Sequence, residues 1–146
     1  MAYRATPVVI GAFFLLAAFA KALSVGSFIT TIQFLTPFLN QSRSEAMPLA
    51  SAIILWEAAL GWCLLIGFAL RWALILTALT LTVFTAVLIR LLLAGDAPSC
   101  SCTGAIRLFN ALSASTPLGI ARNLVFLGGI SWVLSEWSRS RLLARS

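Results

Sequence analysis

The chain has 146 residues, of which 61% are hydrophobic and only 10% are charged, and its mean hydropathy is +1.03. Soluble domains are roughly half apolar and a quarter charged, so this composition excludes an ordinary soluble domain and predicts an integral membrane protein. Ten Lys and Arg residues stand against four acidic residues. Because the basic residues lie at the ends of apolar runs, we assign them to lipid headgroups and membrane orientation, and we expect no nucleic-acid partner.

The residue types that usually hold metals are scarce. The sequence has no histidine, which excludes a histidine general base, a bis-histidine haem and histidine-ligated zinc or copper. Three cysteines are too few for a four-thiolate zinc or iron–sulfur site within one chain. We therefore expect no resident metal site, and we expect the thiols to act as a pair or with a partner.

Four apolar runs reach the roughly 20 residues that a spanning helix needs, at about 7–24, 49–70, 72–94 and 118–137. The first follows Arg4 and ends like a signal peptide, but we take it as a retained helix. Little more than residues 67–71 separates the second and third runs, which predicts a tight antiparallel hairpin. The sequence thus predicts an all-α integral membrane four-helix bundle, a single membrane domain over residues 1–146.

Two longer loops remain, at 24–48 and 95–117. Within the second, residues 104–115 carry four large apolar residues among small and polar ones, which indicates a short amphipathic helix lying at the membrane interface between the third and fourth spans. The four apolar residues are Ile106, Leu108, Phe109 and Leu112. Thr116 and Pro117 then fit an N-cap and the first position of the fourth span.

The distribution of arginines predicts the orientation. Four spans place both termini and the tight hairpin on one side, together with Arg4, Arg71, Arg139, Arg141 and Arg145, whereas the long loops hold only Arg43 and Arg107. By the positive-inside rule, the termini are cytoplasmic and the long loops face outward. We therefore expect a bacterial inner (cytoplasmic) membrane protein whose outer loop, with Cys100 and Cys102, lies in the oxidising periplasm.

Four charged residues fall in the outer half of the membrane. Lys21 lies roughly 21 Å up the first helix and Glu57 roughly 20 Å up the second, so their depths match. One interpretation is an ion pair that locks these helices, with Arg90 and Arg122 reaching the headgroups. The other is an outward-opening cavity beneath the thiols, where a cation favours the reactive thiolate. In either case, Asn123 could add an interhelical hydrogen bond.

The stretch from Ser99 to Gly104 holds two thiols one residue apart, Cys100 and Cys102. A disulfide between them requires a turn at Ser101, and so small a ring is strained; strained, exposed disulfides are the labile, catalytic ones. Two alternatives remain: two thiolates that carry a soft ion such as Cu(I), or inert cysteines, one of which could bond to another protein. Cys63 lies in mid-membrane, where simple packing explains it.

The same residues resemble a known family. The resemblance is carried by the segment from Phe14 to Lys21, Pro37, Trp56-Glu57 followed by Gly61, the Cys100-Ser101-Cys102-Thr103-Gly104 motif and Arg122-Asn123. With these features, the chain resembles the MauE (methylamine-utilisation protein E) branch of the DoxX-like membrane proteins. The resemblance implies a four-helix redox-associated membrane protein with a thioredoxin-like partner, acting in disulfide formation during maturation of exported proteins. Thr103 departs from the family pattern, which commonly has an aromatic residue there.

The function expected from these residues is thiol–disulfide exchange, as a component of an oxidoreductase. Quinone-linked disulfide generators carry Cys-X-X-Cys and usually a second cysteine pair, both of which this chain lacks. Cys100 and Cys102 would therefore pass electrons directly to a partner or to a lipid-soluble acceptor. No cofactor follows directly from the residues; a quinone is one possible acceptor, and Trp56, Trp62 and Trp72 could stack on it or simply belong to the membrane belt. The alternatives are a non-catalytic subunit of a larger membrane complex and a soft-metal carrier.

Overall fold

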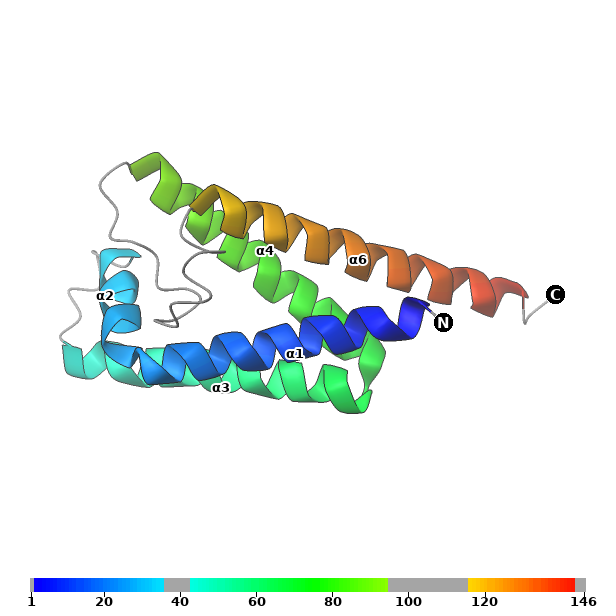
Figure 1. The fold of residues 1–146 in the computed structure, drawn as a ribbon, viewed down its shortest axis with the longest axis horizontal. Coiled ribbons are helices and arrows are strands. Elements are labelled where there is room, and N and C mark those ends of the chain that lie inside the picture. Colours follow the sequence, from blue (N-terminus) through cyan, green and yellow to red (C-terminus); the bar gives the residue numbers. More distant parts are fainter. Residues whose placement is uncertain (1, 36–42, 95–115, 144–146) are drawn as a thin grey trace.

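The computed structural model describes residues 2–35, 43–94 and 116–143, and over these residues the chain is entirely helical outside two short turns (Figure 1). The helices are α1 (Ala2–Leu23), α2 (Val25–Leu35), α3 (Arg43–Ile66), α4 (Leu70–Ala94) and α6 (Thr116–Leu143). Four of them contain apolar stretches long enough to cross a membrane, at Ala5–Leu23, Ala46–Ile66, Leu70–Arg90 and Pro117–Arg139. The predicted all-α membrane fold is therefore confirmed.

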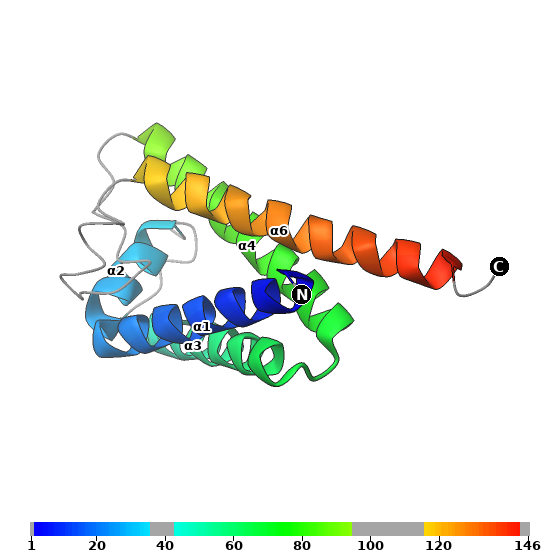
Figure 2. The ribbon, with the colours of Figure 1, turned by 45° about the vertical axis from the view of Figure 1, so that its right-hand side comes forward.

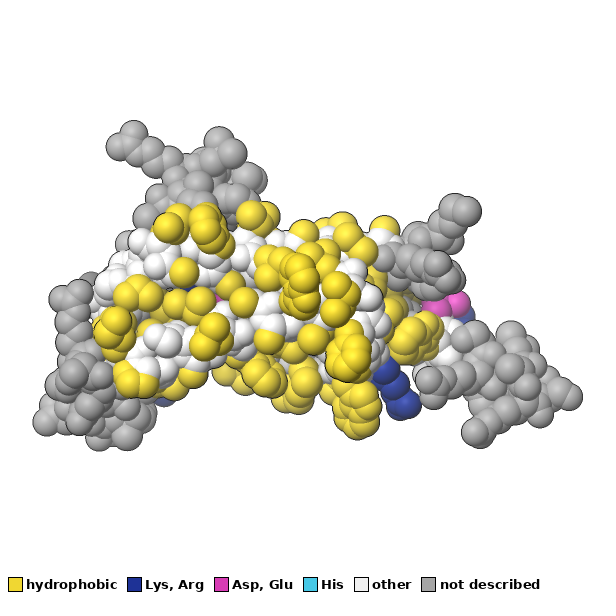
Figure 3. Space-filling view, turned by 90° about the horizontal axis from the view of Figure 1, so that it is seen from below, with side chains coloured by type: hydrophobic (Ala, Val, Ile, Leu, Met, Phe, Trp, Pro, Cys, Tyr) yellow, Lys and Arg dark blue, Asp and Glu magenta, His cyan; other side chains and the backbone are white. Residues whose placement is uncertain are grey.

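The surface fits a membrane-embedded bundle. In Figure 3, apolar side chains cover the middle of the described helices, and most of the visible charged side chains lie toward the end where the chain termini are found. Large side chains such as Leu93, Val125 and Trp72 are strongly exposed. In water such a surface would be unfavourable, whereas against lipid tails it carries no penalty.

The helices pack as two pairs. α1 lies along α3, and α4 lies along α6, in both views (Figures 1 and 2). α4 leaves α3 at their shared turn and diverges from it, so that its far end lies beside the start of α6. The N-terminus, the C-terminal end of α6 and the α3–α4 turn lie at the same end of the bundle, which we call the terminal end.

The turn between α3 and α4 consists of residues 67–69, because α3 ends at Ile66 instead of residue 70 and α4 begins at Leu70 instead of residue 72. Gly67 has a φ of 72°, and the N–H of Phe68 donates to the carbonyl oxygen of Cys63 at 3.0 Å. A left-handed glycine with this backbone bond is the Schellman motif that ends many helices. Ala69 also has a positive φ, and its carbonyl oxygen accepts the first bonds of α4, from Trp72 and Ala73.

The expectation that residues 24–48 form a loop is wrong, because α2 and the first turns of α3 occupy much of this segment. α2 starts directly after a turn at Ser24, whose hydroxyl donates to the carbonyl oxygen of Ala20 at 2.8 Å. Its buried residues repeat at helical spacing and pack against small residues at the start of α3. These are Phe28, Ile29 and Ile32 on α2, and Ala46 and Ala50 on α3. The amphipathic helix expected at 104–115 lies outside the described residues.

Glycine fixes how closely α1 and α3 approach. A methyl group added to Gly11 would lie 2.8 Å from the carbonyl oxygen of Gly61, and one added to Gly61 would lie 2.9 Å from that of Gly11. Only a residue without Cβ permits this contact, and small residues bring membrane helices close in the same way. Because Glu57 lies one turn before Gly61 on α3, the contact also sets the position of that carboxylate relative to α1.

We therefore expect Gly61→Ala to destabilise the protein by about 1–3 kcal/mol, because the added methyl group forces the two backbones apart. Gly128→Ala on α6 is the matched control: no atom lies within 4 Å of its added methyl group, so stability should stay the same or rise by up to about 1 kcal/mol. The measurement is the unfolding free energy in detergent micelles. Equal stability of the two variants would contradict the glycine contact.

Candidate functional site

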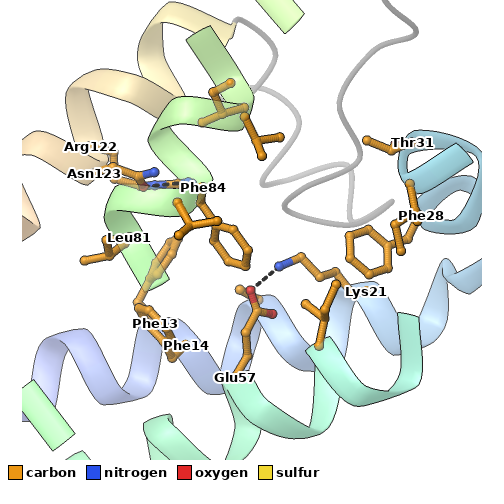
Figure 4. Close-up of a pocket in the computed structure, with 16 residues that line it drawn as sticks. Phe13, Phe14, Lys21, Phe28, Thr31, Glu57, Leu81, Phe84, Arg122 and Asn123 are labelled. Atoms are coloured by element: carbon orange, nitrogen blue, oxygen red, sulfur yellow. Dashed lines mark hydrogen bonds and ion pairs between the residues drawn. The ribbon is translucent and has the colours of Figure 1, made fainter. Parts of the chain in front are cut away.

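A cavity of about 180 Å³ lies where α4 has diverged from α3, with residues from all five described helices in its walls. Figure 4 shows its centre. The apolar walls include four phenylalanine rings, Phe13, Phe14, Phe28 and Phe84, and the polar lining consists of Lys21, Thr31, Glu57, Arg122 and Asn123. The cavity is therefore an aromatic chamber with a few charged groups, lying away from the terminal end.

Lys21 and Glu57 form an ion pair inside this chamber: the Lys21 Nζ donates to the Glu57 Oε1. Each residue is only 2% exposed. The pair joins α1 to α3, as their matching depths predicted. Glu57 lies near the middle of its span, where a charge costs about 2.5–3.5 kcal/mol on insertion scales, so this carboxylate requires a partner.

Aromatic rings complete the surroundings of the Lys21 ammonium. Its Nζ lies 4.7 Å from the ring centroid of Phe84 on α4 and 5.4 Å from that of Phe28 on α2. Ring faces attract cations, and this attraction is stronger where water is excluded. The single ammonium of α1 thus contacts groups on α2, α3 and α4 at once.

Arg122 and Asn123, at the start of α6, link α6 to α1 and α4. The Arg122 guanidinium carbon lies 4.6 Å from the Phe13 ring centroid, and its Nη2 donates to the Asn123 Oδ1 at 3.3 Å. The Asn123 Nδ2 donates to the Thr85 Oγ1 at 3.2 Å, and that hydroxyl donates to the Leu81 carbonyl oxygen at 2.7 Å. The interhelical hydrogen bond expected of Asn123 is therefore present. Arg122 points into the bundle instead of reaching the headgroups (Figure 4).

Two buried polar atoms of the chamber have no hydrogen-bond partner among the described residues: the Glu57 Oε2 and the Arg122 Nε. The charges of these two residues interact electrostatically, but the structure gives no direct contact between them. Leaving such a group unpaired costs about 1–3 kcal/mol, and more when it is charged. The chamber therefore offers a ligand one acceptor from α3 and one donor from α6.

Other residues singled out in the sequence either lie apart from this chamber or fall outside the described residues. Arg90 is exposed on α4 and does not line the cavity. The Trp56 Nε1 donates to the Thr80 Oγ1 at 3.1 Å on the outer surface, and Trp62 and Trp72 are exposed. Cys63 is a free thiol that packs against the apolar core. Cys100 and Cys102 lie outside the described residues.

The aromatic walls were not anticipated from the sequence. Phe28 lies in a segment that the sequence assigns to a loop, and a loop assignment gives no helical register that would place Phe28 and Ile32 on one face. Phe84 and Thr85 lie on α4, a helix that is apolar on all sides. The spacing of its hydrophobic residues therefore does not indicate which face points into the bundle. The usable signal was Phe13 and Phe14, which precede Lys21 by two turns and share its side of α1.

Replacing Lys21 by Met should lower the unfolding free energy by about 3–5 kcal/mol, because it leaves the Glu57 carboxylate buried and unpaired; Glu57→Met should act similarly. The double variant should regain most of that loss, because two apolar side chains need no desolvation. The measurement is a double-mutant cycle in detergent micelles.

Glu136→Gln with Arg139→Gln is the control, since that pair is exposed at an N–O distance of 3.7 Å and should contribute less than about 1 kcal/mol. Single variants at Lys21 or Glu57 that unfold like the wild-type protein would contradict the buried pair.

Comparison with known proteins identifies a family. The family described as Methylamine utilisation protein MauE matches residues 1–136. Searches of curated proteins and of solved structures found no match. The matched region contains all four apolar spans up to residue 136, the whole polar chamber and both loop cysteines. The chain therefore belongs to the MauE family of membrane proteins associated with methylamine utilisation.

Proposed function

We propose that this protein carries out thiol–disulfide exchange through Cys100 and Cys102, in the maturation of exported proteins. One observation carries the proposal. The segment with the Cys-X-Cys motif connects the end of α4 to the start of α6, and the adjoining turns of these two helices supply Val87, Leu88, Arg122 and Asn123 to the buried chamber. The motif thus belongs to the connection at the end of the bundle that holds the buried charged chamber.

The exchange conserves electrons and protons. A client thiolate attacks one sulfur of the Cys100–Cys102 disulfide, which gives a mixed disulfide and one free thiolate in this chain. A second client thiolate then attacks the client sulfur, which closes the client disulfide and leaves both cysteines reduced. Two electrons and two protons have passed to this chain, and a lipid-soluble two-electron acceptor must remove them before the next cycle.

The distribution of charge supports an outward-facing motif. Arg71 and Arg139 are exposed, and they lie at the terminal end, whereas the chamber lies away from that end. Under the positive-inside rule, the terminal end is cytoplasmic and the connection between α4 and α6 faces the periplasm of a bacterium. A disulfide would persist there, and a thioredoxin-like partner could reach it.

A second candidate function is a structural subunit of a larger membrane complex. The observation in its favour is the Lys21–Glu57 pair itself, because ion pairs and hydrogen bonds between spanning helices commonly serve packing alone. In that case the loop cysteines have no exchange partner, and their loss leaves the redox state of exported proteins unchanged.

The test is a single-turnover assay with the full-length protein, oxidised and purified in detergent, and a reduced dithiol peptide. We expect one peptide disulfide per protein chain without added acceptor, and none with the Cys100→Ser/Cys102→Ser double variant. Cys63→Ser is the control and should react like the wild-type protein. Equal peptide oxidation by the double variant, or a wild-type protein that oxidises no peptide, would refute the proposed exchange.

A further inference from the structure

The chamber adjoins a groove on the lipid-facing side of the bundle. A surface groove of about 480 Å³ runs between α3 and α4 and is lined by Ala52, Trp56, Leu79 and Thr80. Ile53, Val83 and Phe84 line both this groove and the chamber. Leu79 and Val83 are more than half exposed, so this side of the bundle faces lipid tails. An apolar molecule could therefore reach the charged chamber without leaving the bilayer.

The volume and the aromatic walls of the chamber suit a single aromatic ring. Its volume of about 180 Å³ slightly exceeds the 150 Å³ or so of an engineered cavity that holds benzene. The rings of Phe13, Phe14, Phe28 and Phe84 provide flat apolar walls (Figure 4), and aromatic rings pack well against one another in offset or edge-to-face contacts. A substituted single ring fits this space, with its substituents extending toward the groove.

The unpaired atoms specify the polar groups of the ligand. The Arg122 Nε–H needs an acceptor, and the Glu57 Oε2 needs a donor. An anionic lipid would satisfy Arg122 but would meet the unpaired oxygen of Glu57 in the same chamber. A neutral ring that carries hydroxyl groups satisfies both residues, because one hydroxyl oxygen accepts from Arg122 while another hydroxyl donates to Glu57.

We propose that this chamber binds the ring of an isoprenoid hydroquinone, with the isoprenoid tail lying in the groove between α3 and α4. The inference rests on the proposed function, because the oxidised form of this ligand, the quinone, is the acceptor that thiol–disulfide exchange requires. Oxidation of the Cys100 and Cys102 thiols to a disulfide releases two electrons and two protons, and a quinone that takes up both becomes the hydroquinone. The chamber holds the reduced form more tightly, since only that form can donate to Glu57.

The experiment measures equilibrium binding of decylubiquinol and decylubiquinone, single-ring analogues with a ten-carbon tail, to the full-length protein in lipid nanodiscs. The wild-type protein should bind the quinol at least about tenfold more tightly, because a hydrogen bond to a charged group distinguishes the two forms. Glu57→Gln, if it remains folded by gel filtration, should lose this preference while Arg122 still binds a ring oxygen.

A second variant avoids the buried pair. Val83→Trp places a large side chain where the groove and the chamber share a wall. Because Val83 is 57% exposed, the fold should tolerate this substitution. Quinol binding should weaken at least about tenfold through steric exclusion. Val125→Trp, on a residue of α6 that is 71% exposed and lines neither space, is the control. Unchanged binding in Val83→Trp, or displacement of the quinol by equimolar oleate, would overturn the inference.

Each of the two proposals, disulfide exchange and quinol binding, can be refuted independently of the other. The Cys100→Ser/Cys102→Ser variant should bind the quinol like the wild-type protein, because the ring site needs no thiol. Quinol binding by a protein that oxidises no dithiol peptide would support the ring site and refute the exchange. Peptide oxidation by a protein that binds neither quinol nor quinone would refute the ring site alone.

Discussion

Burial of two opposite charges inside an apolar bundle is the constraint on which the rest of this structure depends. Lys21 and Glu57 are each 2% exposed, and either one alone would be strongly unfavourable at this depth. Their contact requires α1 and α3 to lie close, which the opposed glycines Gly11 and Gly61 permit. A single register of these two helices satisfies both conditions, so the ion pair and the glycine contact specify the same packing.

The chamber follows from how the remaining helices join this pair. α4 diverges from α3 after their turn, and α2 packs on the start of α3, so aromatic side chains from α2 and α4 converge on the Lys21 ammonium. α6 adds Arg122, whose guanidinium lies over Phe13. The result is a small aromatic space in which the Glu57 Oε2 and the Arg122 Nε remain available to a ligand. A purely structural ion pair would not require those two atoms to be left unpaired.

The sequence predicted the parts of this arrangement that depend on long apolar runs and on charge depth. The spans, the hairpin, the Lys21–Glu57 pair and the interhelical bond of Asn123 all follow from length, rise per residue and the need to pair buried charges. It missed α2, because a short helix between spans lacks the length signal and its stability comes from packing on Ala46 and Ala50. It also grouped Arg90 with Arg122 by depth, whereas depth does not say which side of a helix a residue occupies, and Arg90 is exposed.

The central claim is that an outward-facing thiol pair, attached above a buried charged chamber, takes part in disulfide exchange. Mass-resolved labelling in spheroplasts with a membrane-impermeant thiol reagent, before and after reduction, tests it most directly. The account predicts that Cys100 and Cys102 are labelled only after reduction, while Cys63, which lies within the membrane span of α3, is not labelled in either state. Absence of labelling at Cys100 and Cys102 under both conditions would contradict the account, because these thiols would then be inaccessible from the periplasm.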